Sequence, residues 1–186
     1  MPLIRETIVA TVAADGTPHL APLGLIREGT MWTIAPFQPS ATLANLRAVP
    51  QATASHPADV RVFAGLLTGR REWEVVASEA VRPPRLAGAL SHWELEVSAL
   101  HEDEVRPRFH CRVVHEAAHG AFPGYNRAAA AVIEGAILVS RLRMLAREKV
   151  DAEMAYLRIA VEKTGGAGER EAWGWLEEAV AAQRAG

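Results

Sequence analysis

The segment from Ser40 to Asn45 joins hydroxyl and amide side chains to the start of a predicted helix, and this combination can bind an anion. The first backbone N–H groups of a helix have no partner inside the helix, and the helix dipole adds partial positive charge there, so a phosphate group can dock. Ser40 is a natural N-cap, and Thr42 offers a further side-chain donor, as Asn45 does. The alternative interpretation is that Ser40 only caps the helix, which is the more common role of a serine at this position.

The second predicted strand, at residues 18–26, contains residues that are unusual inside a strand. Pro18 and Pro22 remove ladder donors, and Gly24 has no side chain to pack. The pattern indicates an edge or bulged strand where the backbone comes close to another object. That object can be a flat ligand or a second subunit.

Three histidines, His110, His115 and His119, surround the single cysteine, Cys111, and a metal site is one interpretation. In a strand, side chains alternate between faces, so His110 and His115 point to opposite sides and cannot share an ion unless a bulge intervenes. The sequence therefore predicts no metal site here. Cys111 has no helix N-terminus or fixed cation nearby that would lower its pKa, and an inert thiol is expected.

These residues need a scaffold, and the segment from 5 to 36 predicts its first part, a meander of three antiparallel strands. Residues 7–12 are β-branched and alternating, Asp15-Gly16 is a tight-turn signal, and the chain returns through residues 18–26 and 31–35. A strand at 51–55, which His56-Pro57 should break, a helix at 59–67 and strands at 73–77, 89–100 and 109–117 follow. Six or so strands with short helices predict a small β-barrel.

From Asn126 the pattern becomes helical to the end. One helix is predicted at about 127–148, a second carries Val150 to Val161, and the glycine-rich break at 165–168 separates a third. These spacings are typical of helices that pack on a core, so no catalytic role is assigned to them. We therefore predict a β-barrel domain at 1–122 and a C-terminal helical subdomain at 123–186.

Composition limits the function classes. The chain has 186 residues, 49% of them hydrophobic, and a formal net charge of −2, which is typical of a soluble globular protein. The balanced charge gives no basic surface for nucleic acid and no basic arm for a membrane. The first 11 residues predict neither a signal peptide nor a spanning helix, and one cysteine fits a reducing compartment, so a cytoplasmic location is expected.

The chain resembles the domain-of-unknown-function family 447, within the flavin-binding split-barrel superfamily. The resemblance covers nearly the full length and rests on Asp15 to Gly24, Pro36-Phe37, Ser40 to Leu46, Tyr125 to Glu134, and Glu162 to Gly166. It implies a split β-barrel with a C-terminal helical subdomain, a homodimer, and FMN bound noncovalently near the dimer interface. The step from Thr42 to Asn45 also resembles flavin reductase-like split barrels, in which the matching loop and helix hold the FMN phosphate. The chain departs from the expected pattern at Ser55 to Asp59, where relatives should have an Asn and paired acids.

Both lines of reasoning indicate the same cofactor-binding residues. If the start of the helix holds the phosphate, backbone groups along the strand at 18–26 can meet the polar edge of the isoalloxazine, and an aromatic ring can cover one face. The alternative for the strand residues is packing in the core or at an interface. Arg127 can pair with phosphate or with Glu134 at heptad spacing. The predicted cofactor-binding residues are Pro22, Leu23, Gly24, Phe37, Ser40, Thr42, Asn45, Asn126 and Arg127.

We therefore expect an FMN-binding protein that acts as an oxidoreductase on a small-molecule substrate or electron donor. In such a site the flavin carries the redox step, so the protein needs no dedicated acid or base. His19 and His56 are possible proton donors, although turn or strand-end roles are more common. The chain has no glycine-rich dinucleotide fingerprint that would name the electron donor. The alternatives are a non-catalytic flavin carrier and a split-barrel scaffold without the cofactor.

Overall fold

The computed structural model describes residues 2–185, which form two compact units. The first unit is built from the residues up to Pro57 and from Trp73–Phe122. The second is built from Ala58–Glu72 and from Pro123 onwards. The chain therefore leaves the first unit after Pro57 and returns to it at Trp73. The domain division at residues 122 and 123 remains a prediction.

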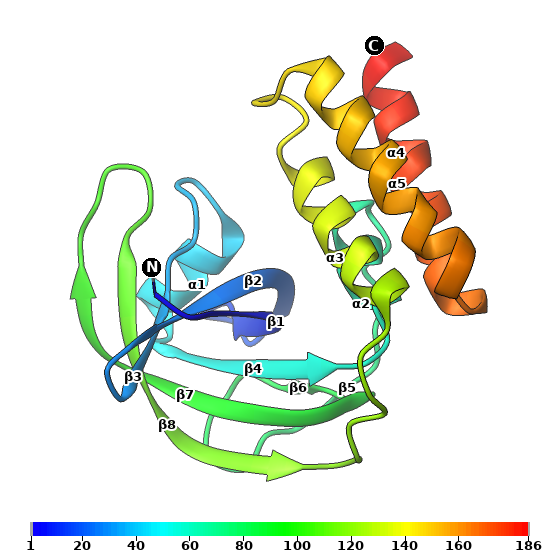
Figure 1. Cartoon of the computed structure of the whole chain (residues 1–186). Coiled ribbons are helices and arrows are strands. Elements are labelled where there is room, and N and C mark those ends of the chain that lie inside the picture. Colours follow the sequence, from blue (N-terminus) through cyan, green and yellow to red (C-terminus); the bar gives the residue numbers. More distant parts are fainter. Residues whose placement is uncertain (1, 186) are drawn as a thin grey trace. The chain divides into compact units, whose positions relative to one another are not determined.

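Six antiparallel strands of the first unit close a barrel, which confirms the predicted split-barrel fold (Figure 1). Around the barrel, each strand is hydrogen-bonded to the next in the order β1-β2-β3-β8-β7-β4, and β4 pairs with β1 to close it. The strands are β1 (Ile4–Val12), β2 (Pro18–Glu28), β3 (Met31–Ile34), β4 (Gln51–Pro57), β7 (Ala89–His101) and β8 (Arg108–Ala118).

Local sequence explains the first hairpin and the core. The predicted turn joins β1 to β2 through Gly16, whose φ of 91° is a conformation that suits glycine. The interior of the barrel is aliphatic and aromatic, with one thiol. Its buried residues are Val9, Leu25, Trp32, Ile34, Leu43, Leu46, Ala52, Ala54, Leu95, Phe109 and Cys111. Leu43 and Leu46 belong to α1 (Ala41–Ala48), which packs against β1 and β2.

A short ribbon follows the helical excursion of residues 58–72. β5 (Val75–Val76) lies within the strand predicted at 73–77. It pairs with β6 (Arg85–Leu86), a strand that the sequence analysis missed because Pro83-Pro84 indicated only a loop. We call residues 77–87 the strap. It lies along β4, because Leu86 N donates to Ser55 Oγ and Thr53 Oγ1 donates to Pro84 O, and its amides also reach Glu94 of β7. The strand predicted at 51–55 extends two residues further and ends at Pro57, and its register shifts between His56 and Pro57, where the break was predicted.

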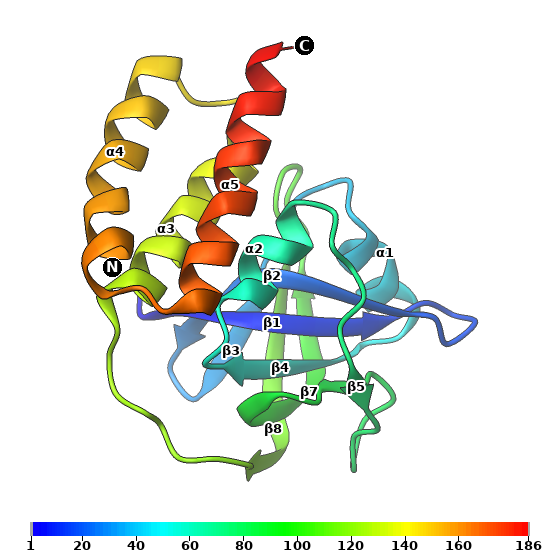
Figure 2. The same cartoon turned by 90° about the vertical axis from the view of Figure 1, so that its right-hand side faces the viewer.

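The second unit is a cluster of helices (Figure 2). It contains α2 (Arg61–Leu67), α3 (Arg127–Ser140), α4 (Arg147–Thr164) and α5 (Ala167–Ala185). Their buried core includes Val60, Ala64, Ala131, Val132, Val150, Met154, Trp173 and Leu176. The predicted helix at 127–148 was wrong at its end, because the chain turns at 141–146 so that α4 can pack back on α3. Among residues 2–185, no helix has both the length and the apolar character needed to cross a membrane.

Candidate functional site

The N-terminus of α1 has the geometry of a helix cap with unused donors. Ser40 Oγ accepts a hydrogen bond from Leu43 N at 3.2 Å, and Ser40 O accepts from Ala44 N at 3.1 Å. The amides of Ala41 and Thr42 come before these and have no acceptor within the helix. The Ser40 hydroxyl still has its own proton to donate, because it serves Leu43 as an acceptor. Capping and anion binding are therefore compatible here.

Thr42 and Asn45 lie on the same helix but are buried in the unit. Asn45 Nδ2 donates to Thr11 Oγ1 at 3.0 Å, and this bond fastens α1 to β1. Only 3% of the Thr42 surface is exposed, and 8% of that of Asn45. Asn45 therefore has a structural role, and one hydrogen of its amide group remains for a further acceptor.

The loop between β3 and α1 carries Phe37, which is exposed. Arg106 holds this loop in place by donating from Nε and Nη2 to Ala35 O at 3.0 and 2.6 Å. The Arg106 guanidinium also lies 4.6 Å from the centre of the Phe37 ring, a cation–π contact. One face of the Phe37 ring is thus taken by Arg106.

β2 presents its predicted site residues in two directions. Leu23 packs against the barrel core, and its carbonyl oxygen accepts from Thr7 Oγ1 at 3.0 Å. Pro22 and Gly24 alternate with it and so face the other way. At Gly24 the place of a Cβ atom is already occupied, with Ile4 Cγ2 at 2.7 Å and Glu6 Oε1 at 3.2 Å. A side chain at position 24 would clash with β1.

The remaining predicted residues belong to the helical unit. Asn126 caps α3, because Oδ1 accepts from Ala128 N at 2.7 Å, and its Nδ2 donates to Thr164 O at the end of α4 at 3.2 Å. Arg127 is exposed and lines a hollow of about 300 Å³ together with Glu134 and Tyr156. The structure thus brings Ser40, Thr42 and Asn45 together on α1, and Asn126 and Arg127 together on α3.

The two histidines considered as proton donors lie on different strands. His19 is on β2, opposite Thr11. His56 is half-buried on β4, where Nδ1 lies 3.1 Å from Ser91 Oγ and the ring meets Trp93 edge-on at 4.5 Å. Burial is the main cause that lowers the pKa of His56, so its ring is neutral near pH 7. Cys111 is buried in the barrel, and burial raises the pKa of its thiol to about 12.

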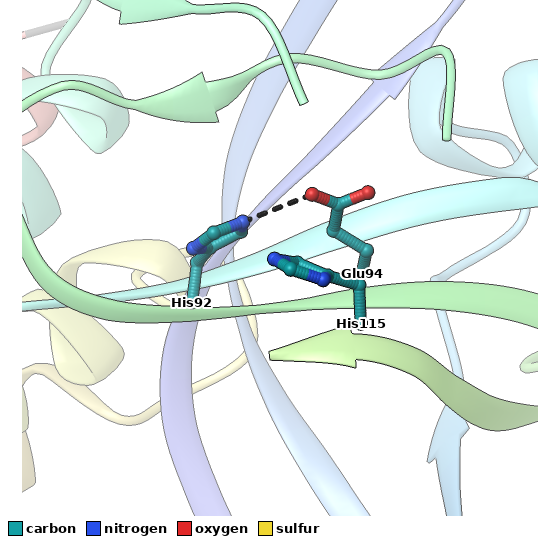
Figure 3. Close-up of side chains that lie close together, drawn as sticks. All are labelled: His92, Glu94 and His115. Atoms are coloured by element: carbon teal, nitrogen blue, oxygen red, sulfur yellow. Dashed lines mark hydrogen bonds and ion pairs between the residues drawn. The ribbon is translucent and has the colours of Figure 1, made fainter. Parts of the chain in front are cut away.

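A second group of polar residues, which the sequence analysis did not foresee, lies between β7 and β8 (Figure 3). Glu94 is fully buried and accepts from three amides of the strap, those of Glu79, Ala80 and Val81, at 2.6 to 3.0 Å. Burial raises the pKa of Glu94, but these bonds and one from His92 outweigh it and leave the pKa lowered. Glu94 is therefore a carboxylate, and it holds the strap on the barrel.

Two histidines of this group, His92 and His119, contact each other, and His92 also contacts Glu94. His92 Nε2 lies 3.1 Å from Glu94 Oε1, and His92 Nδ1 lies 3.0 Å from His119 Nε2. Burial, Arg85 and His92 together lower the pKa of His119. The sequence alone could have placed His92 and Glu94 side by side, because residues two apart on a strand share a face.

A β-bulge adds His115 to this face. Glu94 pairs with His115 while Leu95 pairs with Val113, so Val114 is the extra residue. The inserted residue reverses the alternation after it, and one donor atom each of His92, Glu94 and His115 lie within 4.8 Å of one another. His110, in contrast, contacts Thr33 and Glu28 and does not join the group.

Comparisons with known proteins agree with the fold. Two family models match, described as the N-terminal domain of a protein of unknown function (DUF447) at residues 5–120 and as the protein of unknown function (DUF447) at residues 126–178. No curated protein matches the sequence significantly.

Three solved structures illustrate the likeness. An FMN-bound DUF447 protein from Methanosarcina mazei has a TM-score of 0.83 and 21% identity, with 96% of each chain covered. A 2-nitrobenzoate 2-nitroreductase from Pseudomonas fluorescens has a TM-score of 0.53 and 17% identity, over 64% of this chain and 66% of that one. An FMN-binding protein from Thermus thermophilus, with bound p-hydroxybenzaldehyde, has the same TM-score and identity over 64% and 73%.

Proposed function

The chain belongs to the DUF447 protein family, since the two family models together match most of its length, and on this premise we propose that it binds FMN and acts as a flavin-dependent oxidoreductase. The observation that carries the proposal is the agreement along 96% of both chains with an FMN-bound member of the family. The redox role is supported by the similarity of the barrel to that of the 2-nitrobenzoate 2-nitroreductase. When bound, FMN supplies hydride transfer, and the protein supplies position and shelter from water.

The start of α1 is the proposed phosphate site. The free amides of Ala41 and Thr42 point out of the helix end, and the Ser40 hydroxyl can donate beside them while it caps the helix. Thr42 and Asn45 are proposed as further donors, Asn45 through the amide hydrogen that Thr11 does not use. This donor set is neutral and directional, which suits a phosphate dianion at the positive end of a helix dipole.

β2 and the loop after β3 are proposed to hold the ring system. Backbone groups of Pro22, Leu23 and Gly24 would meet its polar edge, and Phe37 would cover part of a face. Because Ile4 lies against Gly24 and half of the Ile4 surface is exposed, we expect its side chain to turn aside when the ring approaches. Gly24 then allows a close backbone approach.

The helical unit is proposed to contribute a cation. Asn126 Oδ1 caps α3 and Nδ2 donates to Thr164 O of α4, which leaves one amide hydrogen of Asn126 for an anion, and we propose Arg127 as the cationic partner of this predicted pair. Its planar guanidinium suits a phosphate. A homodimer in the cytoplasm, with an unidentified small molecule as substrate or electron donor, completes the proposal.

The test is absorption spectroscopy of the purified protein before and after addition of FMN and desalting. We expect a retained flavin spectrum with one FMN per subunit, followed by repeated bleaching and reoxidation when NADH or NADPH is supplied. If the protein retains FMN but no reductant turns it over repeatedly, the protein is a flavin carrier and not an oxidoreductase. Absence of retained FMN in folded protein would leave a scaffold and refute the proposal.

A further inference from the structure

The group between β7, β8 and the strap has the composition of a transition-metal site. Its donors are two imidazoles and a carboxylate, from His92, His115 and Glu94, and their nearest ligand atoms lie within 4.8 Å of one another. Imidazole nitrogen and carboxylate oxygen are the zinc ligands of many proteins. We propose that this group binds one Zn²⁺ ion, with Glu79 as the fourth ligand.

Distances around His92 already match a bound ion. Two ligand atoms on one tetrahedral zinc lie about 3.3 Å apart, given bonds of about 2.0 to 2.2 Å. His92 Nε2 and Glu94 Oε1 are separated by 3.1 Å. Glu94 keeps its bonds to the strap amides and is thereby fixed in orientation, since a carboxylate oxygen can accept more than one contact.

His115 carries the second independent observation. Its Nε2 atom is buried and has no hydrogen-bond partner among residues 2–185. A buried ring nitrogen without a partner costs free energy, and a metal ion would supply the missing contact. The His115 side chain is 28% exposed, so the ring has room to rotate toward His92 and shorten the 4.8 Å spread.

Glu79 lies where it can complete the coordination of the proposed zinc ion. Its Oε2 atom lies 3.8 Å from His115 Nε2, and its side chain is 75% exposed and therefore mobile enough to swing inward. With two carboxylates and two neutral imidazoles, a divalent ion would leave the site neutral. Four protein ligands describe a structural zinc site, and here the ion would join the strap to β7 and β8.

The bond between His92 and His119 is the outer support such sites require. A metal-bound histidine usually donates its other N–H to a fixed acceptor. Without the ion, His119 Nε2–H donates to His92 Nδ1, and His92 Nε2–H donates to Glu94. With the ion, both rings change tautomer, His92 Nδ1–H donates to His119 Nε2, and His92 Nε2 is free to bind the metal. Neither ring loses a proton, and no heavy atom of this pair has to move.

The test is calorimetric titration of the EDTA-treated full-length protein with zinc chloride, with cobalt chloride as a spectroscopic probe. We expect one Zn²⁺ per chain and cobalt d–d bands of tetrahedral intensity. His115→Ala should weaken zinc binding at least tenfold, because it removes a ligand but none of the bonds that hold the strap. His119→Ala should weaken it about tenfold or more through His92.

His110→Ala is the matched control, since His110 lies on the same strand outside the group. It should bind zinc as the parent protein does. A parent protein that binds no zinc, or equal affinities in His115→Ala and His110→Ala, would overturn the proposal. Thermal melts of each variant show that it is folded, and Glu94 is left unchanged because it anchors the strap.

Discussion

Replacing Ser40 by aspartate separates phosphate binding from helix capping. An aspartate caps a helix about as well as a serine, because its carboxylate can accept the bond that Ser40 Oγ now takes from Leu43 N at 3.2 Å. A negative charge at this end is also favourable to the helix dipole by about 0.3 to 1 kcal/mol. Ser40→Asp should therefore leave the free energy of unfolding unchanged or slightly higher.

The same substitution should repel a phosphate at the amides of Ala41 and Thr42. Two unit charges about 4 Å apart interact by about 1 kcal/mol in water and about 4 kcal/mol at an effective dielectric constant of 20. Ser40 is half-buried, so the repulsion should fall between these limits. Since about 1.4 kcal/mol is a factor of ten, the affinity for FMN should fall about tenfold or more.

Riboflavin provides the internal reference because it has the same ring system and no phosphate. Titrations followed by flavin fluorescence would compare both ligands in the parent protein, in Ser40→Asp, and in Ser40→Thr, which keeps a hydroxyl and a cap. We expect only the FMN affinity of Ser40→Asp to fall. Equal losses for FMN and riboflavin, or an unchanged affinity for FMN, would refute a phosphate site at α1.

Three further outcomes follow from burial and charge. Cys111 should not react with a thiol reagent at pH 8 in the native protein, because burial raises its pKa to about 12, and it should react after denaturation; one fast equivalent in the native state would contradict this. Acid should lower the melting temperature in two stages. The folded pKa of His56 is lowered, so below about pH 6.5 the unfolded chain binds a proton that folded His56 does not, and stability falls. The folded pKa of Glu94 is also lowered, so its stabilising contribution is present above about pH 4.5 and is lost as the pH falls from there through the folded pKa. His56→Gln should shrink the upper stage. A flat profile from about pH 7 to 5 would contradict the His56 stage, and no further loss between about pH 5 and pH 2 would contradict the Glu94 stage. Finally, residues 1–122 expressed alone should aggregate, because α2 loses its partners α3 and α5 and exposes Val60 and Ala64; a monodisperse fragment in size-exclusion chromatography would show the opposite.

The barrel strands were predictable because local sequence and tertiary structure agree there. Residues 7–12 alternate, and the Asp15-Gly16 turn fixes the hairpin. Periodicity also predicted a small barrel and a C-terminal helical subdomain, and the family resemblance identified the barrel as the split type. β6 was not predicted because a strand of two residues carries no periodic signal, and the hydrogen bond that joins Leu86 to Ser55 is distant in sequence.

The helix boundary at 141–146 escaped for a different reason. Arg141 to Leu145 contains no glycine or proline, so the helical pattern runs on without a stop signal. The turn exists because α4 reverses to bury Val150 and Met154 against α3. Tertiary packing overrode local propensity there.

In the candidate sites, too, the local sequence predicts some features and contacts between distant residues determine the others. The capping role of Ser40 was readable from its position before a helix, and the structure confirms it. The bond from Asn45 to Thr11 was not readable, because it joins residues 34 apart. Strict alternation along the strand put His115 on the face opposite His110, and the bulge at Val114 moved it to the other face of the sheet. Bulges depend on the register between strands, so a single strand's composition does not announce them.

The excursion of residues 58–72 into the helical unit has a consequence for protein synthesis. A ribosome makes α2 before the barrel strands β7 and β8, and α2 must wait for Leu176 and Val180 of α5 before its core is complete. At about 5 to 20 residues per second this delay is on the order of 10 s. During that time Val60 and Ala64 are exposed on the nascent chain. Chaperone capture of the nascent protein is therefore expected at this segment, and slow codons after β8 would lengthen the exposure.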